Sequence, residues 1–250
     1  MIFATDLDNT MIFSNRRILG LEKEVKCVEF SDGRPITYMT HSSFAKLTQL
    51  IRETTVIPIT TRSLKQFQRI QIFSELPLAV VDNGGTILQN GKPHAGWEDH
   101  IKRILEKYDL NHVLEIFSTL PSLSSLPTTV DEKYVFAKSD QPDLCKEILE
   151  HSIDTKYWKI SVQRKKIYAI PAEITKGNAL RYICNHLIPG NHLVISSGDS
   201  NLDIPMLDIS DYGLIPSDCD LALSEHTNLI QTGSGIYTSD AILDFVMSHI

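Results

Sequence analysis

The sequence predicts an α/β fold, with a Rossmann-like, three-layer core around a parallel sheet and an inserted α+β cap. Near both ends of the chain, short apolar runs alternate with amphipathic helical segments, which is the pattern of parallel βαβ units. The first run ends abruptly at Asp6, as expected of a buried strand whose carboxyl end carries a site. The middle of the chain has a different pattern, in which hairpins with interposed helices predominate. We therefore expect a core of residues 1–85 and 172–250 and a cap of residues 86–171.

The individual elements follow from apolar periodicity and turn residues. Before the insert, the expected strands are 1–5, 55–59 and 79–81, with a hairpin of 25–30 and 36–39. The expected helices are one that Thr40 or Ser42 caps and that runs to about Arg52, and one at 64–73. Within it, they are a hairpin around Asn90-Gly91, helices at 97–120 and from Asp140, and strands at 134–138, 157–162 and 166–170. After it, they are helices at 176–187 and 238–250 and strands at 192–196 and 212–215.

Composition limits the possible partners. The 250 residues include 24 Lys and Arg against 31 Asp and Glu, for a formal charge of -7, and contain no long basic run. A nucleic-acid partner is therefore not expected. The sequence has neither a basic leader nor an apolar stretch long enough for a membrane span, so we expect a cytoplasmic protein that binds no membrane.

Two acidic residues follow the first predicted strand. Asp6 and Asp8 are two residues apart, so on an extended segment their carboxylates project to the same side. Phosphoryl transfer to water needs a nucleophile and a group that protonates the leaving alcohol, and this pair could supply both. Alone, such a pair is more often a cap or a turn.

Two further segments lie at a strand end and at a helix start. Thr60 and Thr61 follow a predicted strand, where hydroxyl and backbone N–H groups could hold phosphate oxygens. Lys176 begins a helix, where the helix dipole disfavours a cation, and this conflict indicates an anionic partner. Taken alone, helix capping is the favoured explanation for Thr60 and Thr61, and simple solvation is the favoured explanation for Lys176.

A final acidic segment completes the pattern. Asp199 and Asp203 follow another predicted strand. Magnesium prefers oxygen ligands and takes few protein carboxylates, so Asp6, the carbonyl of Asp8 and Asp199 would suit it. A turn with a helix cap is the alternative for this segment. The conjunction of all four segments at strand ends and helix starts is what predicts a site.

The four motifs resemble those of the haloacid-dehalogenase (HAD) superfamily, in order and across essentially the whole chain. They read Asp-Leu-Asp-Asn-Thr, Thr-Thr-Arg, Thr-Lys-Gly-Asn-Ala-Leu and Gly-Asp-Ser-Asn-Leu-Asp. The chain is most similar to the branch with a large α/β cap, which includes Cof-type sugar phosphatases, sucrose-phosphatase and mannosyl-3-phosphoglycerate phosphatase. This resemblance implies a Mg²⁺-dependent phosphomonoesterase that acts on a small phosphorylated metabolite, most simply a sugar phosphate, through an aspartyl-phosphate.

The resemblance also implies residue roles. Asp6 would be the nucleophile, and Asp8 would act first as the acid and then as the base. The phosphoryl group would be held by Thr60, Thr61 and Lys176. The metal site would comprise Asp6, Asp8, Asp199 and Asp203, with Asp203 acting through water or by orienting the other ligands.

Two positions depart from the family pattern. Asn9 stands where Gly is commoner, and Leu202 stands where sugar-phosphatase relatives usually carry Asn. The second departure weakens the case for Cof-type specificity but not for metal binding. In the cap, the residues expected to meet substrate are Lys133, Tyr134, Trp158, Lys159 and Arg164. Solvation of the cations and packing of the aromatic rings are the alternative for each.

Two other functions remain open at this point. The same fold supports phosphotransferases and phosphomutases, which differ in whether water or a sugar hydroxyl reaches the aspartyl-phosphate. A catalytically silent module that binds a phosphate ligand or a protein is the other alternative. Such a module would be expected to lose the nucleophile or the metal acids, and all four acids are present here.

Overall fold

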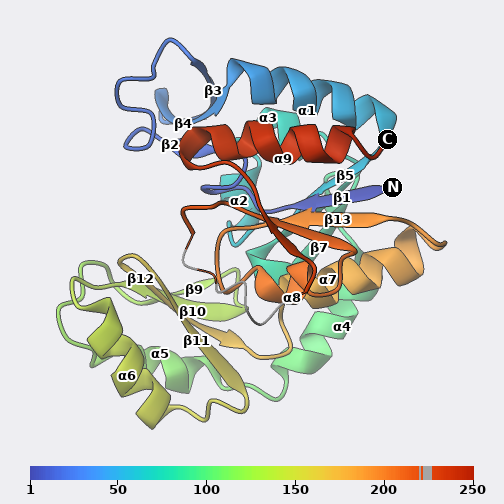
Figure 1. Cartoon of the computed structure of the whole chain (residues 1–250). Coiled ribbons are helices and arrows are strands. Elements are labelled where there is room, and N and C mark those ends of the chain that lie inside the picture. Colours follow the sequence, from blue (N-terminus) through green and yellow to red (C-terminus); the bar gives the residue numbers. More distant parts are fainter. Residues whose placement is uncertain (220, 222–226) are drawn as a thin grey trace. The chain divides into compact units, whose positions relative to one another are not determined.

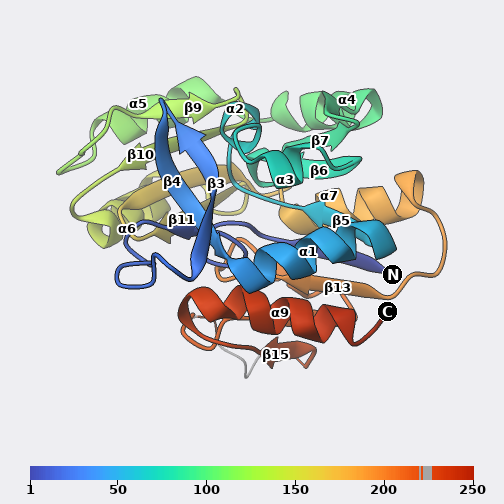
Figure 2. The same cartoon turned by 90° about the horizontal axis from the view of Figure 1, so that it is seen from above.

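The computed structural model describes residues 1–219, 221 and 227–250. These residues form two compact units, Met1–Pro93 with Lys176–Ile250, and His94–Thr175. Figures 1 and 2 show the elements of each unit in two views. The division differs by a few residues from the predicted cap boundaries, since residues 86–93 lie in the first unit and residues 172–175 in the second.

The first unit is built on a five-stranded parallel sheet, which confirms the predicted fold class. The strand order is β15 (Leu229–Gln231), β14 (Tyr212–Ile215), β13 (Val194–Ser197), β1 (Ile2–Thr5) and β5 (Thr55–Pro58). The fully buried apolar side chains of β1 place it at the centre of the hydrophobic core, with β13 on one side and β5 on the other. The edge strand β15 was not predicted.

Helices cover both faces of this sheet. On one face, α1 (His41–Glu53) and α9 (Thr238–Met247) lie side by side, and α7 (Lys176–Tyr182) and α8 (Ile204–Leu207) lie on the other (Figure 1). Helix α1 begins where predicted, because the Thr40 hydroxyl accepts a hydrogen bond from the Ser43 N–H at 2.8 Å. Among the described residues, no helix combines the length and apolarity needed to cross a membrane.

Two small antiparallel sheets complete the first unit. The flap hairpin, β3 (Val25–Ser31) and β4 (Arg34–Thr40), pairs through β4 with β2 (Phe13–Ser14). The second sheet contains β6 (Leu78–Val81), β7 (Thr86–Gln89) and β8 (Lys92–Pro93). Strand β6 was expected in the parallel sheet, but its ladder partner is antiparallel β7, and one parallel bridge, Ile59 to Val80, joins it to the chain after β5. The helix expected at 64–73 forms two short helices, α2 (Leu64–Phe67) and α3 (Gln71–Ser74).

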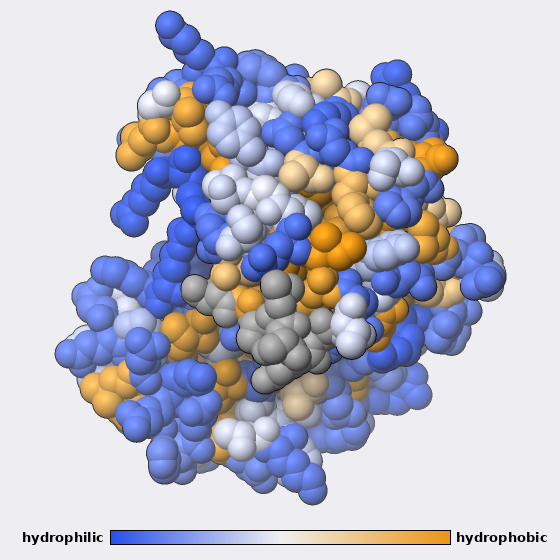
Figure 3. Space-filling view, viewed as in Figure 1, coloured by the Kyte–Doolittle hydropathy of each residue, from blue (hydrophilic) through white to orange (hydrophobic). Residues whose placement is uncertain are grey.

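The second unit is an α+β sandwich with its own hydrophobic core. Its antiparallel sheet has the order β11 (Trp158–Gln163), β12 (Lys166–Pro171), β10 (Tyr134–Lys138) and β9 (Thr128–Val130). Its helices are α4 (Ala95–Leu105), α5 (Leu110–Ser118) and α6 (Pro142–Ser152). The single helix expected at 97–120 was wrong, because Asp109 caps a new helix by accepting a hydrogen bond from the His112 N–H at 3.0 Å. Hydrophilic residues cover most of this unit's face in Figure 3.

Candidate active site

Three predicted site segments meet at the carboxyl edge of the parallel sheet. Asp6 follows β1, Thr60 follows β5 and Asp199 follows β13. Because β1 pairs in parallel with both neighbours, the ends of all three strands lie on the same edge. The fold therefore brings together predicted segments that lie far apart in the sequence.

Lys176 lies at the centre of this edge. Its Nζ donates to Oδ1 of Asp6 and to Oδ1 of Asp203, each at 2.5 Å, and its side chain is 1% exposed. Burial lowers the pKa of Lys176, but the carboxylates of Asp203 and Asp6 raise it by more, so the net shift is upward. The lysine therefore stays charged and fixes one oxygen of each carboxylate.

Asp203 is held from a second side by the loop that precedes it. Its Oδ2 accepts hydrogen bonds from the Ser200 N–H at 2.9 Å, the Ser200 hydroxyl at 2.7 Å and the Asp199 N–H at 3.2 Å. Gly198 permits this close approach, since a Cβ at that position would lie 2.4 Å from the Cβ of Asp203. With both oxygens engaged by the protein, Asp203 is well suited to orient Lys176 and the loop that carries Asp199.

The edge carries an excess of negative charge. Carboxylate oxygens of Asp6, Asp199 and Asp203 lie within 4.8 Å of one another. Burial raises the pKa of Asp6 well above its usual value despite the Lys176 ammonium, and Asp203 and Asp199 add to this. Burial, followed by the charge of Asp203, raises the pKa of Asp199 to about 7. When all three carboxyls are ionised, they leave two negative charges beside the one ammonium, and a divalent cation would offset both.

Asn9 contributes to this cluster, although sequence reasoning treated it only as a departure from the family pattern. It adopts a left-handed conformation with φ 63, which explains why Gly is the commoner residue and why Asn is tolerated. Its side chain hydrogen-bonds to Asp199 and so lowers the pKa of that carboxyl. The signal available in the sequence was that Asn, unlike Gly, brings an amide to this position.

Thr60 is fixed by its backbone on both sides. Its N–H donates to the Val80 carbonyl at 2.9 Å, and its own carbonyl accepts from the Asn83 N–H at 3.0 Å. The buried hydroxyl accepts from the Arg62 N–H at 3.2 Å, which leaves its proton available to another acceptor. Thr61 is half-buried beside it.

Asp8 lies on the loop after β1 and forms an ion pair that was not predicted. Arg62 donates to it twice, from Nε to Oδ2 at 2.7 Å and from Nη2 to Oδ1 at 2.8 Å. Nη1 of the same guanidinium donates to Oε2 of Glu29 at 2.7 Å. Arg62 belongs to the quoted Thr-Thr-Arg motif, but Glu29 lies on the flap hairpin and in none of the four motifs.

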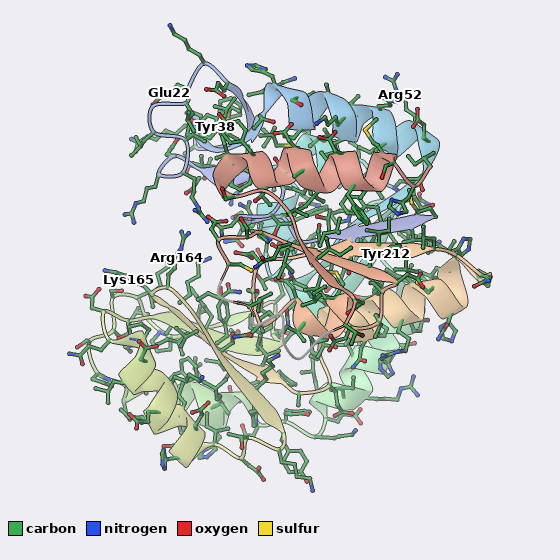
Figure 4. The ribbon with its side chains drawn as sticks, in the orientation of Figure 1. Glu22, Tyr38, Arg52, Arg164, Lys165 and Tyr212 are labelled. Atoms are coloured by element: carbon green, nitrogen blue, oxygen red, sulfur yellow. The ribbon has the colours of Figure 1, made fainter. Side chains whose placement is uncertain are left out.

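The cap residues predicted to meet substrate all lie in the second unit. Tyr134 and Trp158 are buried there, and the Trp158 ring packs edge-on against Tyr108 with centroids 5.0 Å apart. Arg164 lies in the turn between β11 and β12 with φ 57, next to Lys165 (Figure 4). Lys133 precedes β10 and Lys159 is on β11. Contact of these residues with substrate stays a prediction.

Comparison with known proteins identifies the family. Residues 1–242 match the family described as sucrose-6F-phosphate phosphohydrolase. The chain belongs to this family. It is thus a HAD-type phosphatase, as the resemblance implied. No curated protein sequence matches it.

Solved structures of similar fold agree with this family. The sucrose-phosphatase of Synechocystis sp. PCC6803, in complex with sucrose and phosphate, aligns with a TM-score of 0.72 at 17% identity, over 99% of this chain and 97% of that one. A haloacid dehalogenase-like hydrolase of B. subtilis gives 0.60 at 12% identity over 100% and 99%. A HAD subclass IIB sugar phosphatase gives 0.57 at 15% identity over 99% and 98%. At these identities the likeness shows the fold alone.

Proposed function

We propose that this member of the family hydrolyses a phosphorylated sugar through an aspartyl-phosphate on Asp6, with Mg²⁺ bound beside it. The observation that carries the proposal is the buried ammonium of Lys176 between Asp6 and Asp203, 2.5 Å from each carboxylate. This cation fixes Asp6 through Oδ1, while Oδ2, which accepts a hydrogen bond from the Thr10 hydroxyl at 3.4 Å, is the oxygen that attacks phosphorus. It also offsets the charge that an incoming phosphate brings.

Two proton transfers accompany the reaction. As Asp6 bonds to phosphorus, the bond from phosphorus to the sugar oxygen breaks, and Asp8 donates a proton to that oxygen. Asp8 then takes a proton from the water that attacks the aspartyl-phosphate, which releases inorganic phosphate and regenerates Asp6. The Thr60 hydroxyl and the Lys176 ammonium hold the phosphoryl oxygens during both steps.

The residues present fit a bound Mg²⁺. Asp6, the carbonyl of Asp8 and Asp199 would hold it, and Asp203 would orient the loop that carries Asp199. The excess of two negative charges and the raised pKa of Asp199 both support a cation at this point. When bound, Mg²⁺ would neutralise charge on the phosphate and the nucleophile.

The family and one similar structure support a sugar phosphate as substrate. The family is described by its action on sucrose 6F-phosphate, and the Synechocystis enzyme holds sucrose and phosphate. Sucrose 6F-phosphate is therefore the first compound to test. Leu202 stands where sugar-phosphatase relatives usually carry Asn, and it is 2% exposed. Because this position departs from the usual pattern, substrate specificity is to be measured with several sugar phosphates and not with one.

The test is phosphate release from sucrose 6F-phosphate, other sugar phosphates and p-nitrophenyl phosphate, with Mg²⁺ or with EDTA. We expect Mg²⁺-dependent release that Asp6→Asn abolishes. The matched control is Asp244→Asn, because the Asp244 side chain is 63% exposed on α9 and pairs with Lys46. Release that survives in Asp6→Asn would contradict the nucleophile. Transfer of the phosphoryl group to an added sugar in place of water would favour the phosphotransferase.

A further inference from the structure

A row of alternating charges runs from Asp8 to the flap hairpin, all within the first unit. Arg62 donates twice to Asp8 and once to Glu29, and Arg69 Nε lies 3.0 Å from the other oxygen of Glu29. Two carboxylates therefore alternate with two guanidinium groups. Unlike the cluster around Lys176, this row is balanced in charge and needs no further cation.

Glu29 is the fully buried member of this row. Its side chain is 0% exposed, whereas the next residue, Phe30, is 55% exposed. The register of β3 against β4 shifts on both sides of Glu29, and this bulge turns a carboxylate inward and an aromatic ring outward. Burial of a carboxylate costs free energy unless the carboxylate is paired, and Arg62, Arg69 and the Thr37 hydroxyl at 3.0 Å supply the partners.

This arrangement bears directly on Asp8. The Asp8 side chain is 44% exposed on a loop, so nothing in its own burial fixes its orientation. Two parallel hydrogen bonds from a planar guanidinium fix the plane of the carboxyl group. A carboxylate offers about four acceptor sites, so pairing with one guanidinium does not by itself occupy all of them. Glu29 accepts a hydrogen bond from the third nitrogen of the same guanidinium and so helps to fix its plane.

We propose that Glu29 is a positioning residue that acts through Arg62 to orient Asp8 for proton transfer to the leaving group. This inference rests on the proposed function, in which Asp8 is the general acid. It assigns a role to a flap residue outside the four motifs. It also predicts that the flap hairpin affects the chemical step through the pairing of Glu29.

A series of aryl phosphates separates this role from a purely structural one. The leaving groups of phenyl phosphate, 4-nitrophenyl phosphate and 2,4-dinitrophenyl phosphate need progressively less help from an acid. The ratio kcat/KM reports the steps up to the first cleavage of the phosphorus–oxygen bond. A misplaced Asp8 therefore lowers kcat/KM most for phenyl phosphate, whereas loss of folded protein lowers it equally for all three.

The variant to compare with wild type is Glu29→Gln, which keeps the size and one acceptor oxygen but removes the charge. We expect kcat/KM to fall roughly 10- to 100-fold for phenyl phosphate, part of the roughly 10²–10⁴-fold that a general acid supplies, and less than about 3-fold for 2,4-dinitrophenyl phosphate. Glu24→Gln is the matched control, because Glu24 is exposed and bonds to the Tyr237 hydroxyl. It should leave all three values unchanged.

The contrary results are equally distinct. An equal loss for all three esters, or no loss for any, would overturn the role of Glu29. If Glu29→Gln does not fold, Arg69→Gln tests the same point, because Arg69 touches Glu29 and its side chain is 34% exposed. A steeper dependence on the leaving group supports the inference, and an unchanged dependence overturns it. Wild type that cleaves neither these esters nor any of the sugar phosphates would instead contradict the proposed function.

Discussion

The buried Lys176 and the partly buried Arg62 hold carboxylates in different ways. Lys176 contacts a single oxygen on each of Asp6 and Asp203, whereas Arg62 engages both oxygens of Asp8. An ammonium acts as a point charge and a guanidinium as a planar pair of donors. The first therefore leaves the proposed nucleophile an oxygen with which to attack, and the second fixes the plane of the proposed acid.

The charge balance of the two clusters differs as well. Around Lys176, three carboxylates face one cation, while Asp8 and Glu29 face Arg62 and Arg69. Only the first cluster has negative charge left for a divalent cation. The two clusters therefore have different sensitivities to substitution, since one depends on offsetting an excess of negative charge and the other on the geometry of its ion pairs.

The largest effect is expected from Lys176→Met. It leaves Asp6 and Asp203 as buried carboxylates without their cation, and removing one partner of a buried ion pair costs roughly 3–5 kcal/mol of folding free energy. We expect turnover to fall by roughly 10³-fold or more, together with a lower midpoint of thermal unfolding. Lys46→Met is the control, because Lys46 pairs with Asp244 on the surface. A fully active Lys176→Met would refute the role of this cation.

A smaller effect is expected from Arg62→Lys. The charge remains, but a point charge cannot bond to both oxygens of Asp8 and to Glu29 with the same geometry. We expect kcat/KM for phenyl phosphate to fall by roughly 10-fold and that for 2,4-dinitrophenyl phosphate to change little. Adding Glu29→Gln to Arg62→Lys should lower the first value little further, since Glu29 acts through Arg62. If the loss of kcat/KM in the double variant equalled the product of the two single losses, the two residues would act independently.

The pH dependence of Mg²⁺ binding distinguishes the two clusters. Burial raises the pKa of Asp199 to about 7, so below that pH the carboxyl of the metal-free protein carries a proton that Mg²⁺ must displace. We expect calorimetry to give weaker Mg²⁺ binding at pH 6 than at pH 8, by up to roughly 10-fold per pH unit below the pKa. Affinity that is constant from pH 8 to pH 6 would exclude Asp199 as a ligand that titrates in this range.

The smallest effect is expected from Asn9→Gly. Gly adopts the φ of 63 without strain, so stability should change little, but the hydrogen bond to Asp199 is lost. We expect Mg²⁺ affinity to fall by roughly 2- to 5-fold, the worth of about one hydrogen bond. Unchanged affinity would show that Asn9 does not position Asp199 for the metal.

The strand ends and their polar residues could be predicted because they depend on local signals. An apolar run that stops at an acid, as β1 stops at Asp6, gives both the element and the edge of the sheet on which the acid lies. The break between α4 and α5 was missed because the apolar period continues across it. Helix α4 ends at Leu105, and Asp109 caps the start of α5.

Glu29 could not be found from the sequence. Alternation along β3 does not reveal the bulge that turns this residue inward, and its partners, Arg62 and Arg69, are more than thirty residues away. Arg62 was quoted within its motif, but its pairing with Asp8 depends on how the loop after β5 lies beside the loop after β1. Pairing between side chains on separate loops is a tertiary property that local patterns do not encode.

In the proposed mechanism, Asp6 carries the phosphoryl group and Asp8 moves the protons. This mechanism is tested most directly by mixing Asp8→Asn with 2,4-dinitrophenyl phosphate and Mg²⁺ and following the first turnover. Because this ester needs little acid but the aspartyl-phosphate still needs a base, we predict a burst of about one dinitrophenolate per chain, followed by slow turnover. Mass spectrometry should then locate the phosphoryl group on Asp6. Rapid turnover without a burst, or a phosphoryl group on another residue, would contradict the mechanism.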